Sequence, residues 1–185
     1  PPPRAALLPH IWLSDEEIRQ GQRLLEQLPD KAGTPPIALH PYATHPDKAW
    51  KEAYWRQLME LFESRGIPWI VIGRGNGMEG IPASRNFTNR TSLRETCALL
   101  KSSSLLITGD SGPMHLAGAV GTPVLALFGP TTEEWGFFPA GPKDRVLESQ
   151  LDCRPCTLHG KKHCDRNHAC MQSITPEQVM RALDE

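Results

Sequence analysis

The sequence predicts an α/β fold in which a parallel sheet is covered by helices on both faces. Short apolar segments alternate along the chain with segments whose apolar residues recur at helical spacing. The short segments are apolar throughout, as expected of strands that are buried on both faces of a sheet. Polar or glycine-rich loops follow several of these strands, and ligands of such folds bind outside the carboxyl ends of the strands.

The first part of the chain predicts a helix followed by a strand, a helix and a strand. A helix is expected within residues 13–28, where Ser14 opens an S-x-x-E capping box. The runs PPIALHP (35–41) and PWIVIG (68–73) predict short buried strands between breakers. Between them, residues 47–66 repeat apolar side chains at helical spacing, which predicts the connecting helix.

The second part continues the same alternation. SRNFTN (84–89) is a candidate short strand, TSLRETCALLKS (91–102) predicts a helix with a second capping box, and LLITG (105–109) predicts a strand. A very short helix and the strand PVLALFG (123–129) follow. TPEQVMRAL (175–183) predicts a final helix with Thr and Pro in its cap and first-turn positions.

Length and charge predict one domain that binds a small molecule. We expect residues 1–12 to be a linker or domain boundary and residues 13–185 to form the domain, with a Cys-rich excursion at 151–171. Lys plus Arg number 20 and Asp plus Glu number 21, so there is no electrostatic case for nucleic acid or an anionic membrane. We expect a cytoplasmic protein with at most peripheral membrane association.

The segment ITGDSGPMHLAGAVG (107–121) has the pattern of a strand that turns into a short helix. Asp110 or Ser111 would cap the helix, and Gly112 would let a ligand approach the backbone. The free N–H groups and partial positive charge of a helix N-terminus form an anion site, so a phosphate is the expected ligand. The plainer interpretation is that Asp110 and Ser111 only cap the helix and that His115 is a partly buried structural histidine.

Two other loops supply polar groups to the same edge of the predicted sheet. The turn FGPTT contains Gly129 and Thr131, and the loop after the first strand contains Thr44 and Lys48. Lys48 is a candidate cation for a phosphate. Lys48 could equally be a solvated surface lysine. This loop therefore supports a phosphate site only in combination with the other two loops.

The glycine-rich loop GRGNGMEG (73–80) contains a literal G-x-G-x-x-G pattern, which is typical of dinucleotide binding. That fingerprint requires a helix to begin inside the motif, whereas IPASRNFTN follows here without helical periodicity. NAD is therefore the weakest ligand hypothesis. Within this loop, Glu79 could reach a sugar hydroxyl.

Four cysteines cluster near the C-terminus, at Cys153, Cys156, Cys164 and Cys170. They could bind structural zinc, form two disulfides or remain four thiols, and the spacing does not decide between these states. In each case the segment is expected to fasten an irregular excursion to the domain and not to form the reaction centre. Cys97 lies in a helical apolar pattern and is expected in the core.

Residues 109–131 (GDSGPMHLAGAVGTPVLALFGPT), HPYATHPDKAW (40–50) and the tail CRPC…CM…ITPEQV resemble the ADP-heptose:lipopolysaccharide heptosyltransferases of glycosyltransferase family 9. The tail resembles the branch that adds the second heptose. The resemblance implies the C-terminal, Rossmann-like, nucleotide-sugar-binding half of a two-domain GT-B enzyme. Lys51 and Gly118 depart from the residues usual in the family, Pro and Ala.

The resemblance also implies residue roles. The donor site would contain the residues that match family motifs, with Lys48 also stabilising the leaving group: Thr44, Lys48, Thr91, Asp110, Ser111, Gly112, His115, Gly129 and Thr131. The donor would be ADP-heptose and the acceptor the lipopolysaccharide inner core, bound through a missing N-terminal half that also carries the general base. No cofactor and no metal at the site are required, although a divalent cation is compatible.

Two alternatives to this function remain open. A sugar-nucleotide epimerase half-domain shares the two-half architecture, and a zinc-stapled, non-enzymatic interaction module would explain the cysteines.

Overall fold

The computed structural model describes residues 9–30, 33–156 and 164–184 and confirms the α/β class. All neighbouring strands of its sheet pair in parallel, in the order β2-β1-β3-β4-β5. The strands are β1 (Ile37–His40), β2 (Trp69–Val71), β3 (Leu105–Gly109), β4 (Val124–Phe128) and β5 (Arg145–Glu148).

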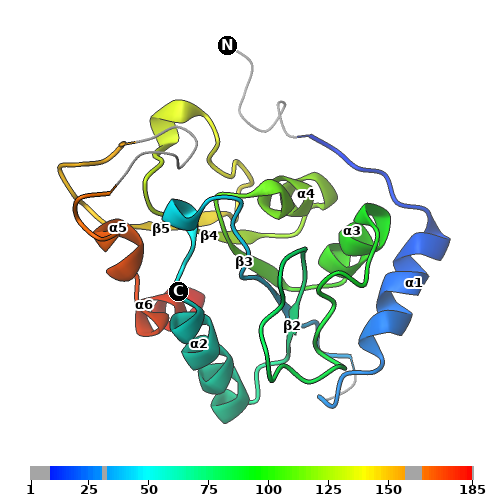
Figure 1. Cartoon of the computed structure of the whole chain (residues 1–185). Helices are drawn as coiled ribbons and strands as arrows, with labels where there is room; N and C mark the ends of the chain where they lie inside the picture. Colours follow the sequence, from blue (N-terminus) through cyan, green and yellow to red (C-terminus); the bar gives the residue numbers. More distant parts are fainter. Residues whose placement is uncertain (1–8, 31–32, 157–163, 185) are drawn as a thin grey trace.

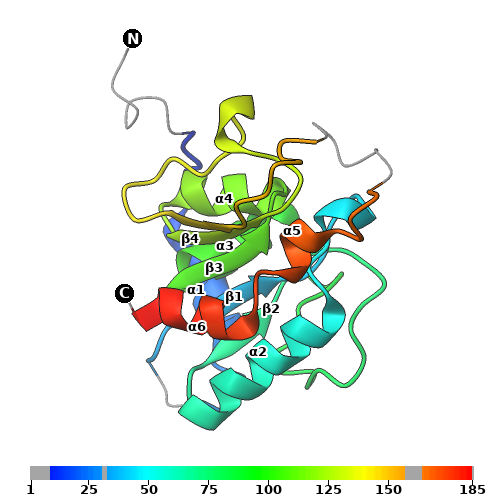
Figure 2. The same cartoon turned by 90° about the vertical axis from the view of Figure 1, so that its left-hand side faces the viewer.

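Helices cover both faces of the sheet (Figures 1 and 2). The helices are α1 (Asp15–Leu25), α2 (Glu52–Arg65), α3 (Leu93–Lys101), α4 (Gly112–Val120), α5 (Ala169–Gln172) and α6 (Pro176–Asp184), with 3-10 turns η2 (Pro46–Lys48) and η3 (Glu133–Trp135). Side chains from α2, α5 and α6 pack on one face, and side chains from α3 and α4 pack on the other, where α1 lies outside α3.

The two cores follow from the alternation of side chains along fully buried strands. Ile37 and Leu39 of β1 point to the face covered by α2, whereas Ala38 points to the face covered by α3 and α4. Burial on both faces explains why β2 and β4 are apolar at every position and β1 at every position except its last, His40.

The structure confirms the helix ends that were predicted from capping residues. Ser14 and Ser92 each accept a hydrogen bond from the backbone N–H three residues on, and the Glu at that position bonds back to the serine N–H. Gly121 ends α4 in the left-handed conformation, with φ of 79°, which glycine adopts at no steric cost. Thr175 likewise accepts from the N–H of Gln178 at the start of α6.

Two expectations about strands need correction. Residues 84–89 form no strand; Asn86 makes one isolated parallel bridge to Val71 beside the end of β2. β5 was not expected because it is a half-buried edge strand whose ends are charged, Arg145 and Glu148, so it lacks the apolar run that marks the inner strands.

Gly21 is the point at which α1 crosses α3. A Cβ atom at this position would lie 2.7 Å from the backbone carbonyl group of Ala98, which cannot move without shifting α3. We therefore expect Gly21→Ala to lower the free energy of unfolding by about 1–3 kcal/mol, although alanine has the higher helix propensity.

Gly118 in α4 provides the matched control for this prediction, because a Cβ atom there meets nothing within 4 Å. Gly118→Ala should raise the free energy of unfolding by about 0.5–1 kcal/mol. Urea unfolding of both variants measures the two effects. Equal responses of the two variants would contradict the close crossing at Gly21.

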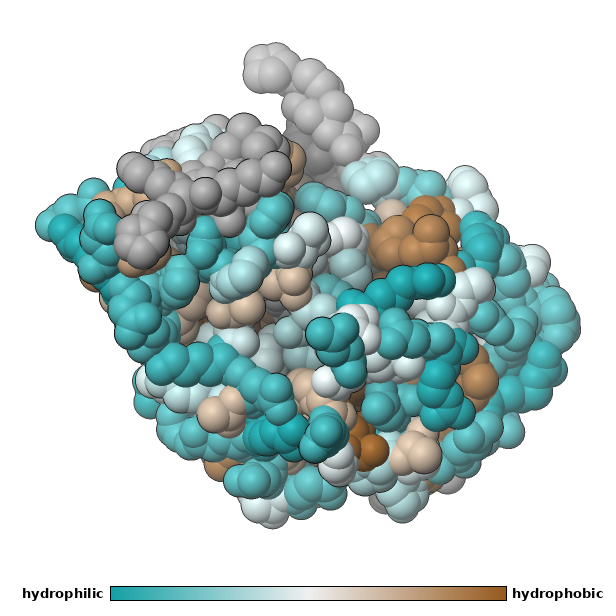
Figure 3. Space-filling view, in the orientation of Figure 1, coloured by the Kyte–Doolittle hydropathy of each residue, from teal (hydrophilic) through white to brown (hydrophobic). Residues whose placement is uncertain are grey.

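Figure 3 shows a largely hydrophilic face with one compact hydrophobic patch in the region of α3 and α4. Among the described residues, Trp12 and Leu93 are the most exposed large hydrophobic side chains, at 82% and 68%. Within residues 9–30, 33–156 and 164–184, no helix combines the length and the hydrophobicity needed to cross a bilayer.

Candidate functional site

The order of the strands creates a crevice between β1 and β3. The helix that follows β1 covers one face of the sheet and the helix that follows β3 covers the other. At such a switch point the two connections diverge, and ligands of open α/β sheets bind outside the carboxyl ends of the strands there. A cavity of about 440 Å³ lies at this place, lined by residues from segments 40–44, 73–74, 91–96 and 111–116.

The N-terminus of α4 opens at this cavity. β3 ends at Gly109, and Ser111 is the N-cap residue, in extended conformation with φ of −156° and ψ of 167°. Pro113 occupies the first turn, where its missing N–H costs nothing. Ser111 and Gly112 line the cavity, so the partial positive charge of the helix end faces it. This geometry suits an anion.

Ser111 does not cap α4 with its side chain. Its Oγ lies 2.9 Å from Oγ1 of Thr108 and 3.2 Å from Nδ1 of His40. Nδ1 of His40 lies 3.1 Å from the same Thr108 oxygen. Thr108 is fully buried and His40 is 6% exposed, so the half-buried Ser111 is hydrogen-bonded to two buried polar groups behind the helix end.

Burial lowers the pKa of His40 to about 4, so its ring is neutral at pH 7. The unfolded chain protonates this ring below a pH of about 6.5, whereas the folded chain does so only below about 4. Between these values the unfolded state binds more protons, and stability therefore falls as the pH falls. We expect a loss of about 2–3 kcal/mol across this window from this residue.

Urea unfolding at pH 7, 5.5 and 4.5 tests the prediction. His40→Asn should show a flatter dependence on pH than the wild type. His115→Asn, at an exposed histidine on α4, should keep the wild-type dependence. If His40→Asn also keeps it, the ring is not the group that destabilises the chain in acid.

An ion pair lies beside the cavity, between Lys48 of η2 and Asp110 after β3. Lys48 Nζ is 2.5 Å from Oδ2 of Asp110, and the two side chains are only 13% and 9% exposed. Thr131, fully buried after β4, donates its hydroxyl to the same carboxylate oxygen at 3.1 Å. Asp110 therefore joins the three loops that follow β1, β3 and β4, and Lys48 keeps donor capacity for a ligand.

Arg154 holds the turn that carries Thr131. This arginine side chain is 5% exposed and donates to the backbone oxygens of Phe128, Gly129, Thr131 and Ser149, and to the carboxylate of Glu148. The N–H of Cys156 also donates to Pro130 O at 3.1 Å. The segment C-R-P-C thus fastens the turn after β4.

The glycine-rich loop after β2 closes the cavity from the other side. A Cβ atom at Gly73 would lie 2.5 Å from Cδ2 of His40, and one at Gly75 would overlap the ring of Tyr42. No helix begins between β2 and α3, so the literal G-x-G-x-x-G pattern is not a dinucleotide fingerprint, as expected. Glu79 is exposed and is not among the residues that line the cavity.

The sequence-predicted residues fall into three groups. Four line the cavity: Thr44, Thr91, Ser111 and Gly112. Three form the adjoining ion-pair cluster: Lys48, Asp110 and Thr131. Two lie apart from both: His115 is exposed on α4 outside the lining, and Gly129 is buried where a side chain would overlap Met171 of α5.

Sequence reasoning missed several side chains that line the cavity, among them His40, Tyr42 and Arg74. His40 ends β1 and Tyr42 follows it, so their place at the carboxyl end of a predicted strand was the available signal. Arg74 follows β2 in the glycine-rich loop and is exposed. The side chain of Leu93 adds an apolar wall at the start of α3.

Comparison with protein families decides the class of this chain. Residues 9–165 match the family model described as glycosyltransferase family 9 (heptosyltransferase). The chain belongs to glycosyltransferase family 9. Lipopolysaccharide heptosyltransferase 1 of Pseudomonas aeruginosa is 35% identical over 153 residues, which cover 75% of this chain and 40% of that protein.

Other heptosyltransferases are also similar to this chain. Lipooligosaccharide heptosyltransferase 2 of Campylobacter jejuni is 33% identical over 72% of this chain and 44% of its own length. The solved structure of E. coli ADP-heptose lps heptosyltransferase II matches with a TM-score of 0.74 at 22% identity, over 99% of this chain and 54% of that one. The family 9 chain thus shares the fold and spans about half the length of these relatives.

In the described part of this family 9 chain, Cys97, Cys153, Cys164 and Cys170 form no disulfide. Burial raises the pKa of the Cys170 thiol and of the Cys97 thiol, which lies in the core as expected. Within the described residues no group of three or more His, Cys, Asp or Glu side chains could hold a metal ion. Those residues therefore give no support to the zinc alternative for Cys153, Cys156, Cys164 and Cys170; His159 and His163 lie outside the described residues.

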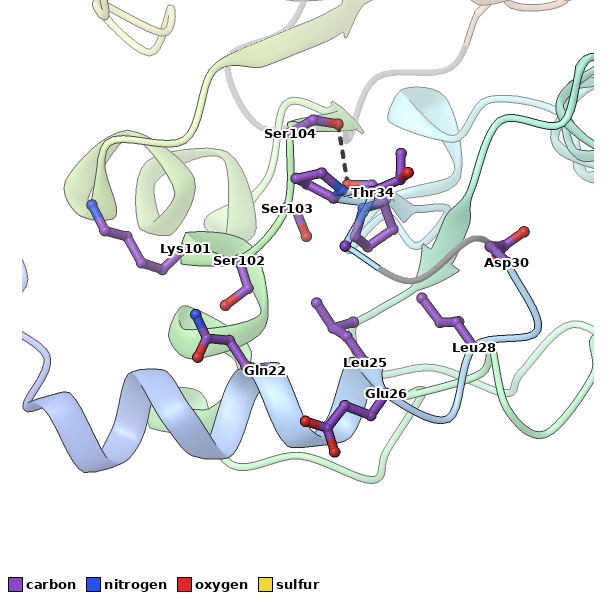
Figure 4. Close-up of a pocket in the computed structure, with 13 residues that line it drawn as sticks. Gln22, Leu25, Glu26, Leu28, Asp30, Thr34, Lys101, Ser102, Ser103 and Ser104 are labelled. Carbon is purple, nitrogen blue, oxygen red and sulfur yellow. Dashed lines mark hydrogen bonds between the residues drawn. The ribbon is translucent and has the colours of Figure 1, made fainter.

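A larger cavity, of about 720 Å³, lies at the opposite edge of the sheet of this family 9 chain (Figure 4). Its wall includes Pro36 and Ser104, which precede β1 and β3, and residues at the C-terminal ends of α1 and α3. Those helix ends carry partial negative charge, which disfavours anions. The smaller cavity at the carboxyl ends of the strands is therefore the better candidate for a nucleotide diphosphate.

Proposed function

We propose that this chain is the C-terminal, donor-binding half of an inverting glycosyltransferase that transfers heptose from ADP-heptose to the lipopolysaccharide inner core. The observation that carries the proposal is the convergence of the α4 N-terminus, Lys48 and the Ser111 hydroxyl at one crevice. The relatives are lipopolysaccharide or lipooligosaccharide heptosyltransferases by name, which supports the sugar and the acceptor. The E. coli structure is named for ADP-heptose, which supports the donor.

The site residues match the demands of this reaction. When the acceptor oxygen attacks the anomeric carbon from the face opposite ADP, the bond to the β-phosphate oxygen breaks and negative charge builds on the diphosphate. Donors that are oriented before the reaction stabilise this charge, and each typically contributes a few kcal/mol. Lys48 and the N-terminus of α4 supply such donors, and Asp110 and Thr131 hold Lys48 in place.

The other end of the cavity suits a nucleoside. Leu93 and Leu116 offer apolar surface, and Thr91 and Thr96 place hydroxyls beside it. Leu93 is 68% exposed, so its side chain is available to pack against a flat ring once a ligand binds. We assign the adenine to this end and the diphosphate to the end formed by Ser111 and Gly112.

The acceptor, and the general base that activates its hydroxyl, would belong to a domain outside this chain. This chain is therefore expected to bind the donor without transferring the sugar. Incubation with ADP-heptose and a heptose-accepting lipopolysaccharide core, followed by mass spectrometry, should show no transfer. Transfer by this chain would contradict the division of roles.

The proposal also covers the cofactor requirement, the cellular location and the alternative epimerase activity. The chemistry needs no cofactor, and a divalent cation could neutralise the diphosphate without a dedicated site. We expect the intact protein to act in the cytoplasm, at most at the membrane surface. An epimerase half-domain would convert the nucleotide sugar without an acceptor, and product analysis distinguishes the two activities.

Calorimetric titration with ADP, and with UDP and NAD as controls, tests the donor site. We expect ADP to bind selectively and Ser111→Ala to weaken it about tenfold, the value of one hydrogen bond to a charged group. His115→Ala measures whether the exposed histidine of α4 takes part as the family resemblance implies. UDP or NAD binding as tight as ADP would contradict the proposed donor.

A further inference from the structure

Ser111 behaves differently from the other N-cap serines of this chain. Ser14 and Ser92 accept hydrogen bonds from backbone N–H groups of α1 and α3, at 3.3 and 3.2 Å. Ser111 occupies the same position of α4 but accepts no such bond. Since serine oxygen at an N-cap normally satisfies one of the free N–H groups of the first turn, another interaction must divert this side chain.

The diverting groups are His40 and Thr108. Oγ of Ser111 lies 3.2 Å from Nδ1 of His40 and 2.9 Å from Oγ1 of Thr108. Both partners come from strands of the rigid sheet, His40 from β1 and Thr108 from β3, which pair in register. The hydroxyl of Ser111 is therefore held from behind by groups that do not move with the loop.

The position of the ring proton follows from the partners of each nitrogen. Nδ1 of His40 faces two hydroxyl oxygens, either of which can accept a hydrogen bond. Among the described residues, no hydrogen bond to Nε2 is formed, and this nitrogen lies beside Gly73. The Thr108 hydroxyl donates to the backbone oxygen of Gly109 at 3.1 Å, so its oxygen can only accept from Nδ1. The neutral ring is therefore expected to carry its proton on Nδ1.

A proton on Nδ1 of His40 determines which hydrogen bonds the Ser111 hydroxyl can form. The ring donates to Oγ of Ser111, so the hydrogen of that hydroxyl is not needed for the ring. In the free chain this hydrogen faces Oγ1 of Thr108 at 2.9 Å, and rotation about the C–O bond lets it donate toward the cavity when an acceptor is bound. Because Oγ is drawn to His40, the backbone N–H groups at the start of α4 also stay uncapped by this side chain. Both effects prepare the helix end for phosphate oxygens, which accept hydrogen bonds and donate none.

We propose that His40 is a positioning residue for the donor diphosphate: it donates from Nδ1 to Ser111 Oγ, which keeps that side chain from capping α4 and directs its hydroxyl into the crevice. This inference rests on the proposed function for the identity of the ligand. The hydrogen bond between His40 and Ser111 does not depend on the proposed function, because it is formed in the chain without a ligand.

Two variants of His40 separate positioning from packing. His40→Phe fills a similar volume without a donor, whereas His40→Asn places an amide N–H near the position of Nδ1. We expect His40→Phe to weaken ADP binding about tenfold, as Ser111→Ala does, and the double variant to be no weaker than either single one. His40→Asn should retain affinity within about threefold of the wild type.

Nitrogen NMR of the ¹⁵N-histidine-labelled wild-type chain reads the ring proton directly and needs no ligand. A proton on Nδ1 supports the proposal, and a proton on Nε2 overturns it, whether or not His40→Phe folds. ADP affinity of a folded His40→Phe equal to wild type also overturns it. A wild-type chain that fails to bind ADP while its His40 proton lies on Nδ1 contradicts the proposed function and supports the hydrogen bond.

Discussion

Lys48→Ala is expected to weaken ADP binding by roughly 100-fold or more, beyond what the loss of one surface cation would cause. Lys48 and Asp110 are a nearly buried pair, so the variant removes a phosphate donor and also leaves a carboxylate without its counter-charge beside the diphosphate. Removing one partner of a buried pair costs about 3–5 kcal/mol because the remaining charge is poorly solvated. Both effects act against an anionic ligand.

A double-variant cycle separates the two contributions. Asp110→Asn in the Lys48→Ala background should recover about tenfold in affinity, because the uncompensated negative charge is gone while the donor is still missing. Lys51→Ala, three residues further on at an exposed lysine, should leave ADP binding unchanged. The cycle is measured by calorimetry at fixed salt. No recovery in the double variant would mean that Asp110 does not repel the ligand.

In a protein that joins this chain to the proposed acceptor-binding domain, we expect Lys48→Ala to depress kcat more than it weakens nucleotide binding. The reason is that the charge on the leaving diphosphate is larger in the transition state than in the bound donor. Single-turnover kinetics with saturating ADP-heptose measures this difference. An unchanged kcat would assign Lys48 to ground-state binding alone.

The parts of the site that could be predicted from the sequence are those formed within a few residues. The turn from β3 into α4 depends on neighbours in the chain: Ser111 at the N-cap, Pro113 in the first turn and the left-handed Gly121. The capping boxes at Ser14 and Ser92 are equally local. Helix caps of this kind require a backbone geometry that only a few residue types satisfy. They can therefore be predicted without knowledge of the tertiary structure.

The parts that could not be predicted depend on residues far apart in the sequence. Lys48 and Asp110 are 62 positions apart, and nothing near either residue indicates the other. The place of His40 at the end of a predicted strand indicates the edge of the sheet at which it lies. Its contacts, however, depend on Thr108 of the neighbouring strand and on the space that Gly73 leaves for its ring. Long-range pairs of this kind are specified by the packing of the whole sheet.

In the motif C-R-P-C, the residue with the most contacts to the turn after β4 is Arg154 and not either cysteine. In C-R-P-C the sequence draws attention to the two cysteines and to metal or disulfide chemistry. The structure instead assigns the fastening of the turn after β4 to the arginine between them, whose guanidinium donates to four backbone oxygens and one carboxylate. The planar group with five N–H donors suits such a cluster of acceptors.

We therefore expect Arg154→Met to lower the free energy of unfolding by about 3–5 kcal/mol, since buried backbone oxygens lose their donors together. For a domain of this size the loss corresponds to a fall in Tm of about 10 °C. Arg166→Met is the matched control: this arginine is exposed in the same Cys-rich segment, and its loss should cost less than about 0.5 kcal/mol. Thermal unfolding followed by circular dichroism measures both.

The same variant should also weaken ADP binding at temperatures where it remains folded. Arg154 positions the backbone of Thr131, and Thr131 donates to the carboxylate that holds Lys48, so a looser turn releases the cation from its place at the crevice. Calorimetry on the folded fraction of Arg154→Met, with Arg166→Met beside it, tests this chain of contacts. Wild-type affinity in a destabilised Arg154→Met chain would show that the turn after β4 supports the fold without positioning Lys48.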